Sequence, residues 1–366
     1  MAQVRDGGDR LFTGLSPTNR KVAAWSATVL LALGVAAFIV WVVVVLRAAT
    51  VPFVLALLGT ALLEPLMPWL MKRGVSRALA SGLTCVGLVV LVCGALVGVI
   101  HSLTESAGKI ADGLAEAGDE LADRFGPVGD KLQSAVDGMS DTGAKVASSA
   151  ASGLVSGLSL ATQALASLVL ALALVFLFLR DGDRSEAFVR HLFPGGHADT
   201  AVAIARRAYA SLAGYMRGTT LVALIDGLLI FAGLVILGVP GAAGLGALVF
   251  MGAYIPFVGA FLSGLVAVLV ALAHGGISTA LWALLVVVAV QAIEGNFLQP
   301  AIQSRTVSLH PATVMLSVAA GASIAGVLGA LLAVPLSAAG VGVVEELRAR
   351  AGATPDDGGA DSPRGG

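Results

Sequence analysis

Charged side chains are scarce in this sequence: Asp, Glu, Lys and Arg make up 12% of its 366 residues, whereas apolar residues make up 57%. Water-soluble domains carry about 25% charged residues, so this composition excludes an ordinary soluble fold. Cysteine is limited to Cys85 and Cys93, both within one apolar run, which argues against a disulfide framework. The formal net charge of -1 provides no basic field for nucleic acid. We therefore expect an integral membrane protein that has the lipid bilayer as a partner and no nucleic acid partner.

Sequence motifs of catalysis and metal binding are also missing. The chain has no HExxH, GxSxG or GxxxxGK[ST] pattern, and its five histidines show no i, i+4 pairing. These absences argue against a hydrolase, a metal site and a nucleotide-driven pump. We expect no enzyme activity, no metal and no cofactor, so any uphill transport would draw on an ion gradient.

Long apolar runs are what the sequence has in abundance. A helix needs about 20 apolar residues to cross about 30 Å of hydrocarbon. Runs of that length within residues 22–100 predict three transmembrane helices, and residues 158–179 predict a fourth. Residues 218–344 are apolar over much greater lengths but are interrupted by glycine and proline. We predict an all-α polytopic membrane protein with about eight transmembrane helices, including broken or re-entrant helices in the C-terminal half.

Two polar segments separate these membrane regions. Residues 101–145 carry four Lys or Arg against nine Asp or Glu, a local charge of -5, and apolar residues recur there every three or four positions. This period predicts an amphipathic helix, so we interpret residues 101–157 as an extracytoplasmic helical hairpin that packs on itself or on other copies in a homo-oligomer. An acidic flexible loop is the alternative. Residues 180–217 predict a helical connector.

The distribution of Lys and Arg predicts the orientation in the membrane. With eight spans, 16 of these residues fall on the side of the two termini and 6 on the other side. Because positive residues accumulate on the cytoplasmic side, we expect residues 1–21, 180–217 and 345–366 in the cytoplasm. The last of these segments is rich in Gly, Asp, Pro and Ser, which predicts disorder. The protein is thus expected to be a multi-pass protein of the plasma membrane.

Ionisable and polar side chains stand at a few points inside residues 218–344, which we interpret as the transport core. Such groups are costly at bilayer depth and therefore indicate function. Asp226 lies within the predicted fifth span, where it either responds to protons or cations in a pathway or bonds a neighbouring helix near the interface. The polar cluster at 291–311 either lines the pathway or forms an exposed loop. The candidate pathway residues are Asp226, Gln291, Glu294, Asn296, Arg305 and His310.

Helix-breaking residues interrupt the same region, and paired Gly or Pro interruptions point to binding sites in transporters. Residues 241–273 are too many for one straight span, so they predict either a long kinked helix or two half-helices around a break at 255–259. The candidate breaks and hinges are Pro240, Pro256, Gly259, Pro300, Pro311, Gly326, Gly329 and Pro335.

The C-terminal third carries a set of short motifs in a fixed order. They read LGVP at 237–240, IPxxG at 255–259, QxIEGN at 291–296, LHP at 309–311, GxxG at 326–329 and VP at 334–335. With these motifs the chain resembles the autoinducer-2 exporter family over residues 225–340. It departs from the family pattern at Ser304, where Gly is usual before the basic residue, and at Ala322, which replaces the second Gly of a pair.

The resemblance implies a multi-spanning, homo-oligomeric protein that exports small solutes. Members of the family are assigned to autoinducer-2 export, and others to exchange of sodium or lithium for protons. Our leading hypothesis is an ion-gradient-coupled permease or exporter of a small polar solute, with Asp226, Glu294 and Arg305 as candidate coupling or binding groups. The alternatives are an Na+(Li+)/H+ antiporter and a membrane scaffold that binds partners through residues 101–145.

Overall fold

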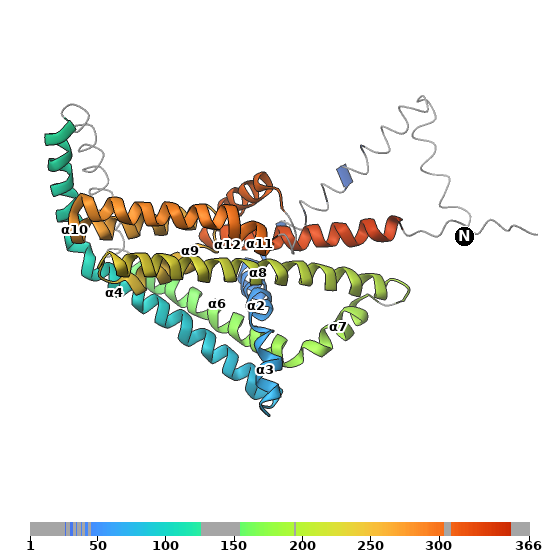
Figure 1. The fold of residues 1–366 in the computed structure, drawn as a ribbon. Coiled ribbons are helices and arrows are strands. Elements are labelled where there is room, and N and C mark those ends of the chain that lie inside the picture. The colour runs from blue at the N-terminus through green and yellow to red at the C-terminus, as the bar shows by residue number, and fades with distance from the viewer. Residues whose placement is uncertain are drawn as a thin grey trace, which may run out of the picture. The chain divides into compact units, whose positions relative to one another are not determined.

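The computed structural model describes residues 45–125, 154–193, 195–303 and 309–352, together with isolated positions between 26 and 42. The chain divides into two units, Met1–Val51 and Pro52–Gly366, which we describe separately. In the first unit the described positions between 26 and 42 are helical, and the rings of Phe38 and Trp41 stack with centroids 6.0 Å apart. In the second unit the described residues form helices and no strand, so the predicted all-α class is confirmed (Figure 1).

Four helices form the N-terminal part of the second unit. They are α2 (Arg47–Leu63), which begins in the first unit, α3 (Leu66–Lys72), α4 (Arg77–Phe125) and α6 (Leu154–Asp181). Pro65 follows α2, and the axes of α2 and α3 differ by 52°. A shared apolar core joins all four helices and includes Ala56, Met67, Ala80 and Val175. Burial of these side chains holds the four helices together.

The helix α4 continues well past the predicted end of the third span at residue 100. Its backbone stays helical through Phe125 and so enters the segment that we interpreted as an amphipathic hairpin. Residues 126–153 lie outside the described part of the chain, as do the side chains of 105–125. The helical character of the first arm is therefore observed, whereas the hairpin, its packing and the acidic-loop alternative stay predictions.

The predicted connector 180–217 is helical throughout most of its described length. It contains a short 3-10 turn η1 (Gly182–Arg184), α7 (Ser185–Leu192) and the first half of α8 (Ala198–Ile236). The axis of α7 turns by 98° from that of α6. Ion pairs from Glu186 to Arg206 and from Arg190 to Asp199 fasten α7 to α8. The predicted boundary between connector and fifth span, after residue 217, falls inside α8. This helix continues from Ala198 to Ile236.

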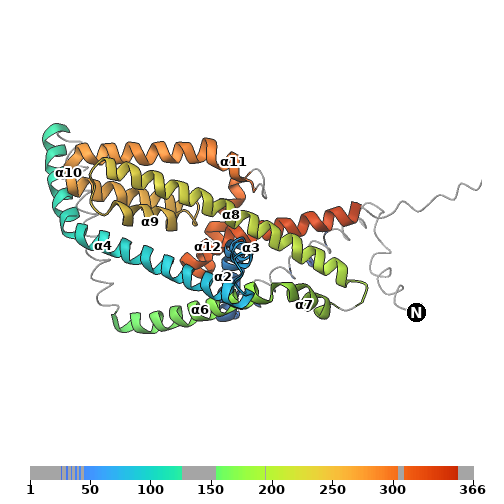
Figure 2. The same cartoon turned by 60° about the horizontal axis from the view of Figure 1, so that its bottom comes forward.

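The helices of residues 218–344, which we interpreted as the transport core, fold back on one another (Figure 2). After α8 come α9 (Ala242–Gly252), α10 (Val258–Ile293), a π-helical turn η2 (Glu294–Leu298), α11 (Gln299–Gln303) and α12 (Pro311–Gly352). Non-helical backbone breaks α10 at Gly275 and Gly276 and breaks α12 at Ala325 and Gly326. Each break lets the second arm of the helix return alongside the first.

Glycine contacts bring α9 close to α10 and bring the two arms of α12 close to each other. A Cβ atom on Gly259 would collide with the backbone of Gly252, and one on Gly329 would collide with the backbone of Gly321. At Gly326 the backbone angles of φ 60° and ψ -141° lie in a region that side chains avoid. The hydroxyl groups of Ser317 and Ser337 lie 2.9 Å apart across the α12 hairpin. These contacts support the predicted breaks at Gly259, Gly326 and Gly329.

The prolines predicted as breaks take different places. Pro240 lies in the α8–α9 turn between two glycines of positive φ, and Pro256 lies between α9 and α10. This arrangement matches the two half-helices that we considered for residues 241–273. Pro311 is the first residue of α12, a position where the missing N–H costs nothing. Pro335 lies in the second arm of α12, where the backbone angles remain helical, so a hinge there stays a prediction.

By helix length and composition, the described residues contain four to six candidate membrane spans. Four helical stretches are each long and apolar enough to cross a membrane. Two bent pairs, α2 with α3 and α6 with α7, are long enough only when the two helices of a pair are counted as one span. Two of the four single stretches contain the breaks in α10 and α12, so their arms are shorter than the stretches suggest. A polytopic membrane protein is thus confirmed, and the count of eight spans stays a prediction.

Candidate functional site

Asp226 lies in the middle of the apolar half of α8 and is 1% exposed. Its Oδ1 atom has no hydrogen-bond partner among the described residues. The carboxyl group lies beside that of Glu294. Burying a carboxyl group is costly, and a second carboxyl group beside it adds to that cost, so this arrangement among apolar helices points to a function other than packing. This pair is the centre of the candidate site.

Glu294 is brought to Asp226 by the π-helical turn η2. The N–H of Gln299 donates to the carbonyl of Glu294, five residues back, in place of the usual four. Pro300 follows directly and has no N–H to continue the α-helical pattern. The Gln299 Nε2 atom also donates to Oε1 of Glu294 at 3.1 Å, which fixes the direction of this half-buried carboxyl group. Thus the predicted break at Pro300 positions a predicted pathway residue.

The break between α9 and α10 also contacts α8, six residues before Asp226. Phe257 has φ 65° and ψ -54°, and the N–H of Val258 bonds the carbonyl of Pro256 at 2.8 Å. This is a γ-turn of the rare, strained type. One residue before the break, the Tyr254 hydroxyl lies 2.9 Å from the hydroxyl of Thr220 on α8. Strained backbone of this kind clusters at functional sites.

The hairpin of α12 completes the surroundings of α8. Its buried residues Val318, Ala330 and Val334 pack against Tyr215 of α8 and Ile255 of the α9–α10 break. Three interrupted helices therefore converge on one stretch of α8 between residues 215 and 226. Both views of the fold show α8 running alongside α9, α10 and part of α12 (Figures 1 and 2).

A second polar cluster lies nearer the N-terminal end of α8. Arg217 donates to Oε2 of Glu64 at 2.9 Å and to the carbonyl of Ala61 at 3.1 Å, and the Tyr209 hydroxyl donates to the same Glu64 oxygen at 3.2 Å. Arg217 and Glu64 are each about half exposed. Asp226 is nine residues further along α8, which is about 14 Å at 1.5 Å per residue. The carboxyl pair therefore lies well inside the apolar region if this ion pair marks its edge.

The other predicted pathway residues have more local roles. Gln291 is half-buried in the last turns of α10, and the exposed Asn296 amide donates to the carbonyl of Ala292 at 2.9 Å. The Nδ1 atom of His310 accepts from the N–H of Ala312 at 3.2 Å, so His310 caps the start of α12. Arg305 lies outside the described residues. Of the six candidates, the structure brings Asp226 and Glu294 together.

Metal and cofactor sites were not expected. Among the described residues no group of three His, Cys, Asp or Glu side chains is arranged to hold a metal ion. A carboxyl pair alone offers too few ligands for a divalent cation, which takes six or more oxygens. Two carboxyl groups in contact away from water repel each other when both are ionised, so the pair favours a bound proton or a monovalent cation between them.

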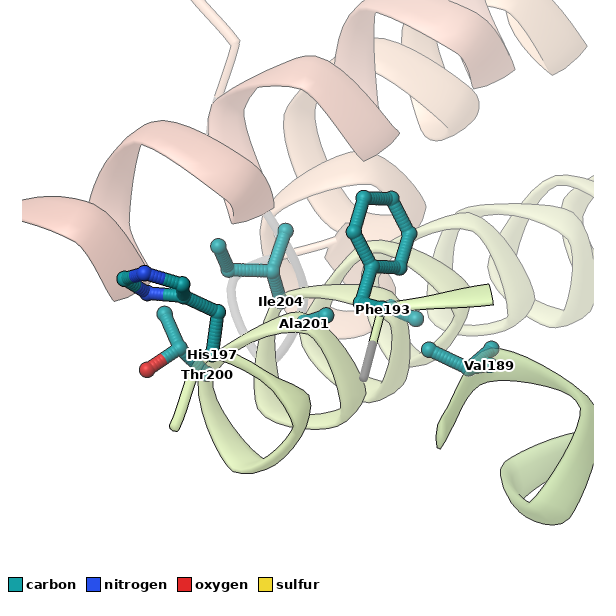
Figure 3. Close-up of a pocket in the computed structure, with 7 residues that line it drawn as sticks. Val189, Phe193, His197, Thr200, Ala201 and Ile204 are labelled. Atoms are coloured by element: carbon teal, nitrogen blue, oxygen red, sulfur yellow. The ribbon is translucent and has the colours of Figure 1, made fainter. Parts of the chain in front are cut away.

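A hollow of about 380 Å³ lies elsewhere, between α7 and the start of α8 (Figure 3). Its lining is almost wholly apolar and includes Val189, Phe193, Ala201 and Ile204. It lies more than 20 residues before Asp226 on α8, about 30 Å along the helix. The lining offers little for a polar solute, so we do not place the functional site there.

Several residues of the site were missed by sequence reasoning. Thr219, Thr220 and Tyr254 read as ordinary membrane-helix residues because hydroxyl groups are tolerated there when they bond the backbone. The pairing of Glu64 with Arg217 joins residues 153 positions apart, which no local pattern reveals. A signal existed for Thr219, which lies seven residues, or two helical turns, before Asp226 and so on the same face of α8.

Comparisons with known proteins agree with this arrangement. The family model described as AI-2E family transporter matches residues 29–349. The chain is 37% identical over 332 residues to "Putative transport protein MT0215" of Mycobacterium tuberculosis, which covers 88% of this chain and 89% of that protein. It is 26% identical over 300 residues to "Putative transport protein YhhT" of Escherichia coli, covering 78% and 81% of the two chains. A shorter match of 165 residues at 34% identity joins it to "Putative transport protein YueF" of Bacillus subtilis, over 45% and 44% of the two chains.

The family match extends over most of the chain and includes both members of the carboxyl pair. It agrees with the long apolar helices of the described residues. The expected resemblance to the autoinducer-2 exporters is therefore confirmed. The chain belongs to the AI-2E family of transporters and is a multi-pass membrane transport protein.

Proposed function

We propose that this chain is a permease that exports a small polar solute of the autoinducer-2 kind across the plasma membrane, and that it is not an enzyme. The observation that carries the proposal is the contact between the Asp226 and Glu294 carboxyl groups where broken helices meet α8. In transporters, discontinuous helices supply the polar backbone groups that bind solutes and coupling ions near the middle of the bilayer. The arrangement here has these same parts.

The carboxyl pair gives the proposed transporter a means of coupling. A proton or cation that binds between the two groups removes their repulsion, and its release restores it. The two states differ in charge at the junction of η2 with α8, so each favours a different packing of the hairpins. An imposed ion gradient then drives the solute, consistent with the lack of a nucleotide-binding motif. In this scheme Asp226 and Glu294 bind the coupling ion.

An Na+(Li+)/H+ antiporter is the second candidate, and the same pair of carboxyl groups favours it. A site that takes one proton or one monovalent cation, but not both at once, exchanges the two across a membrane without any further solute. The antiporter and the permease thus share a site and differ in cargo. Sodium-dependent pH changes inside vesicles would separate them.

Other expectations remain part of the proposal. With the termini in the cytoplasm, the ion pairs of α7 and the N-terminal half of α8 would lie on the cytoplasmic side. A homo-oligomer would use the apolar face of residues 101–157, and nucleic acid would play no part. The scaffold alternative assigns the function to residues 101–145. Deleting them would abolish function on that view but would leave basal transport intact if they only assemble protomers.

The experiment is solute efflux from vesicles that contain the purified full-length protein, measured with and without a proton gradient. A panel of small hydroxylated and keto compounds serves as the set of probes. Asp226→Asn combined with Glu294→Gln keeps side-chain volume while removing both acidic groups, and Glu346→Gln on the exposed end of α12 is the matched control. We expect gradient-dependent efflux to be lost in the double variant alone. Equal rates in the double variant and the wild type would remove the pair from the mechanism.

A further inference from the structure

Thr219 differs from Thr60 and Thr84, the other buried threonines in the described helices of this protein. Helical threonines usually donate their hydroxyl group to the backbone carbonyl four residues earlier. That bond is present at Thr60, Thr84, Thr104, Thr220 and Thr279. The Thr219 hydroxyl is buried, at 6% exposure, and has no hydrogen-bond partner among the described residues. The side chain of Tyr215 lies next to it and interacts with it, although the two hydroxyl groups do not meet the geometry of a hydrogen bond.

The position of Thr219 connects it with the carboxyl pair. Thr219 and Asp226 are separated by two helical turns, about 10 Å, and lie on the same face of α8. They supply the two buried side-chain oxygens that lack partners among the described residues. The next residue, Thr220, bonds Tyr254 at the strained α9–α10 break. Tyr215, one turn before Thr219 on the same face of α8, packs against the α12 hairpin, so the Thr219 hydroxyl group stands on a face that meets a broken helix.

A buried hydroxyl without a partner lowers the stability of a fold, and a turn of its side chain would let it bond the backbone. Packing offers no reason to keep it, because valine has the same shape and no polar atom. Two such oxygens on one helix face, in a protein that moves solutes, are explained together if a solute meets both. This explanation rests on the proposed function.

We propose that Thr219 is a solute-binding residue of the passage along α8. Its hydroxyl group would donate a hydrogen bond to, or accept one from, a polar solute on its way to or from the Asp226–Glu294 pair. The passage then has two polar groups on α8: the neutral hydroxyl group of Thr219 and, two turns further on, the carboxyl group of Asp226. A solute with several hydrogen-bonding groups can bind both groups, whereas an unhydrated monovalent cation would need only the carboxyl group.

The first test separates stability from transport. Thr219→Val removes the hydroxyl and keeps the shape, Thr219→Ser keeps the hydroxyl, and Thr84→Val is the control because its buried hydroxyl is bonded to Ala80. We expect Thr219→Val to unfold at or above the wild-type temperature, Thr84→Val at or below it. In the vesicle efflux assay, the rate of solute efflux through Thr219→Val should be about two- to tenfold lower than through the wild type, the effect of losing one hydrogen bond. Thr219→Ser should restore the rate.

The second test does not depend on knowing the solute. Thr219→Cys is made in a full-length chain whose native Cys85 and Cys93 are replaced by Ala, and the charged thiol reagent MTSET is added to reconstituted vesicles. Ile230→Cys is the control, because Ile230 is equally buried on α8 but packs in an apolar core. We expect MTSET to modify Thr219→Cys while Ile230→Cys stays unmodified, since the passage must open to water-borne molecules.

The outcomes distinguish this inference from the proposed function. If Asp226→Asn stops efflux but Thr219→Val is stable and transports at the wild-type rate, the permease stands and the role of Thr219 is wrong. The role is also wrong if Thr219→Val unfolds below Thr84→Val, or if Thr219→Cys resists MTSET as Ile230→Cys does. If the wild type shows no gradient-dependent efflux, the proposed function fails, and the labelling result still reports whether water reaches Thr219.

Discussion

The guanidinium group of Arg217 lies 2.9 Å from the carboxylate of Glu64 and joins α8 to the corner where α2 meets α3. The Arg217 side chain also donates to the carbonyl of Ala61, the last turn of α2. The contact therefore fixes α8 against the bend that Pro65 produces. About 14 Å further along α8, the Oδ1 atom of Asp226 has no hydrogen-bond partner among the described residues. Arg217 is thus tied to α2 and to Glu64, whereas we propose Asp226 as a residue that binds the coupling ion.

The Glu64–Arg217 pair should contribute little to stability, because both side chains are about half exposed. Ion pairs in contact with solvent contribute about 0–1 kcal/mol. We expect Glu64→Gln to lower the unfolding temperature only slightly and the coupling energy in a double-mutant cycle with Arg217→Gln to stay below about 1 kcal/mol. Thermal unfolding in detergent measures both. A coupling of about 3 kcal/mol or more would show that the pair is buried in the assembled protein.

The turn at Gly326 should tolerate no side chain. Its angles of φ 60° and ψ -141° are accessible to glycine at low cost and strain other residues by about 1–3 kcal/mol. Gly326→Ala should lower the free energy of unfolding by that amount. Gly340→Ala is the control, because it lies within the same helix with open space around it and helical angles. Equal stability of the two variants would mean that the α12 hairpin does not turn at Gly326.

The close approach of Gly252 and Gly259 gives a second prediction about packing. A methyl group at Gly259 would collide with the backbone of Gly252, which cannot move aside as a side chain can. Overpacking of this kind costs about 1–3 kcal/mol, so Gly259→Ala should unfold at a lower temperature than the wild type. Gly82→Ala on α4, with open space around it, should be neutral or more stable. A stable Gly259→Ala variant would contradict the observed turn between α9 and α10.

The α12 hairpin can be tested by a cross-link. The hydroxyl oxygens of Ser317 and Ser337 are 2.9 Å apart although the residues are 20 positions apart in sequence. Cysteines at both positions, in a chain without Cys85 and Cys93, should form a disulfide on mild oxidation. Pairing Ser337→Cys with Ser323→Cys is the control, because Ser323 bonds the backbone of its own arm. A straight α12 would place residues 317 and 337 about 30 Å apart and form no cross-link.

The predicted class followed from composition, and the breaks followed from glycine and proline. Runs of apolar residues required helices in lipid, and residues such as Pro256 and Gly326 predicted interruptions. The structure has Pro256 between α9 and α10 and non-helical backbone at Gly326. Asp226 stood out because a carboxyl group is costly in such a run. These features are local, so the sequence alone reveals them.

The partners of these residues could not be predicted in the same way. The contact of Asp226 with Glu294 depends on how α10 turns back, and the position of Glu294 depends on a π-helical turn that a five-residue hydrogen bond defines. His310 was expected in the pathway because it is polar, yet it caps α12. Polarity marks residues of interest, but the three-dimensional packing decides which of them meet.

The most direct test of the carboxyl pair is proton flux through the reconstituted full-length protein. Vesicles loaded with the pH dye pyranine receive the protein, an imposed sodium gradient in one series and the solute panel in another. We expect the wild type and Glu64→Gln to change the internal pH at comparable rates. Asp226→Asn should slow the change by at least about 100-fold, as removal of a proton-transferring group does. A wild-type rate of proton movement in Asp226→Asn would contradict the assignment of the coupling site to Asp226 and Glu294.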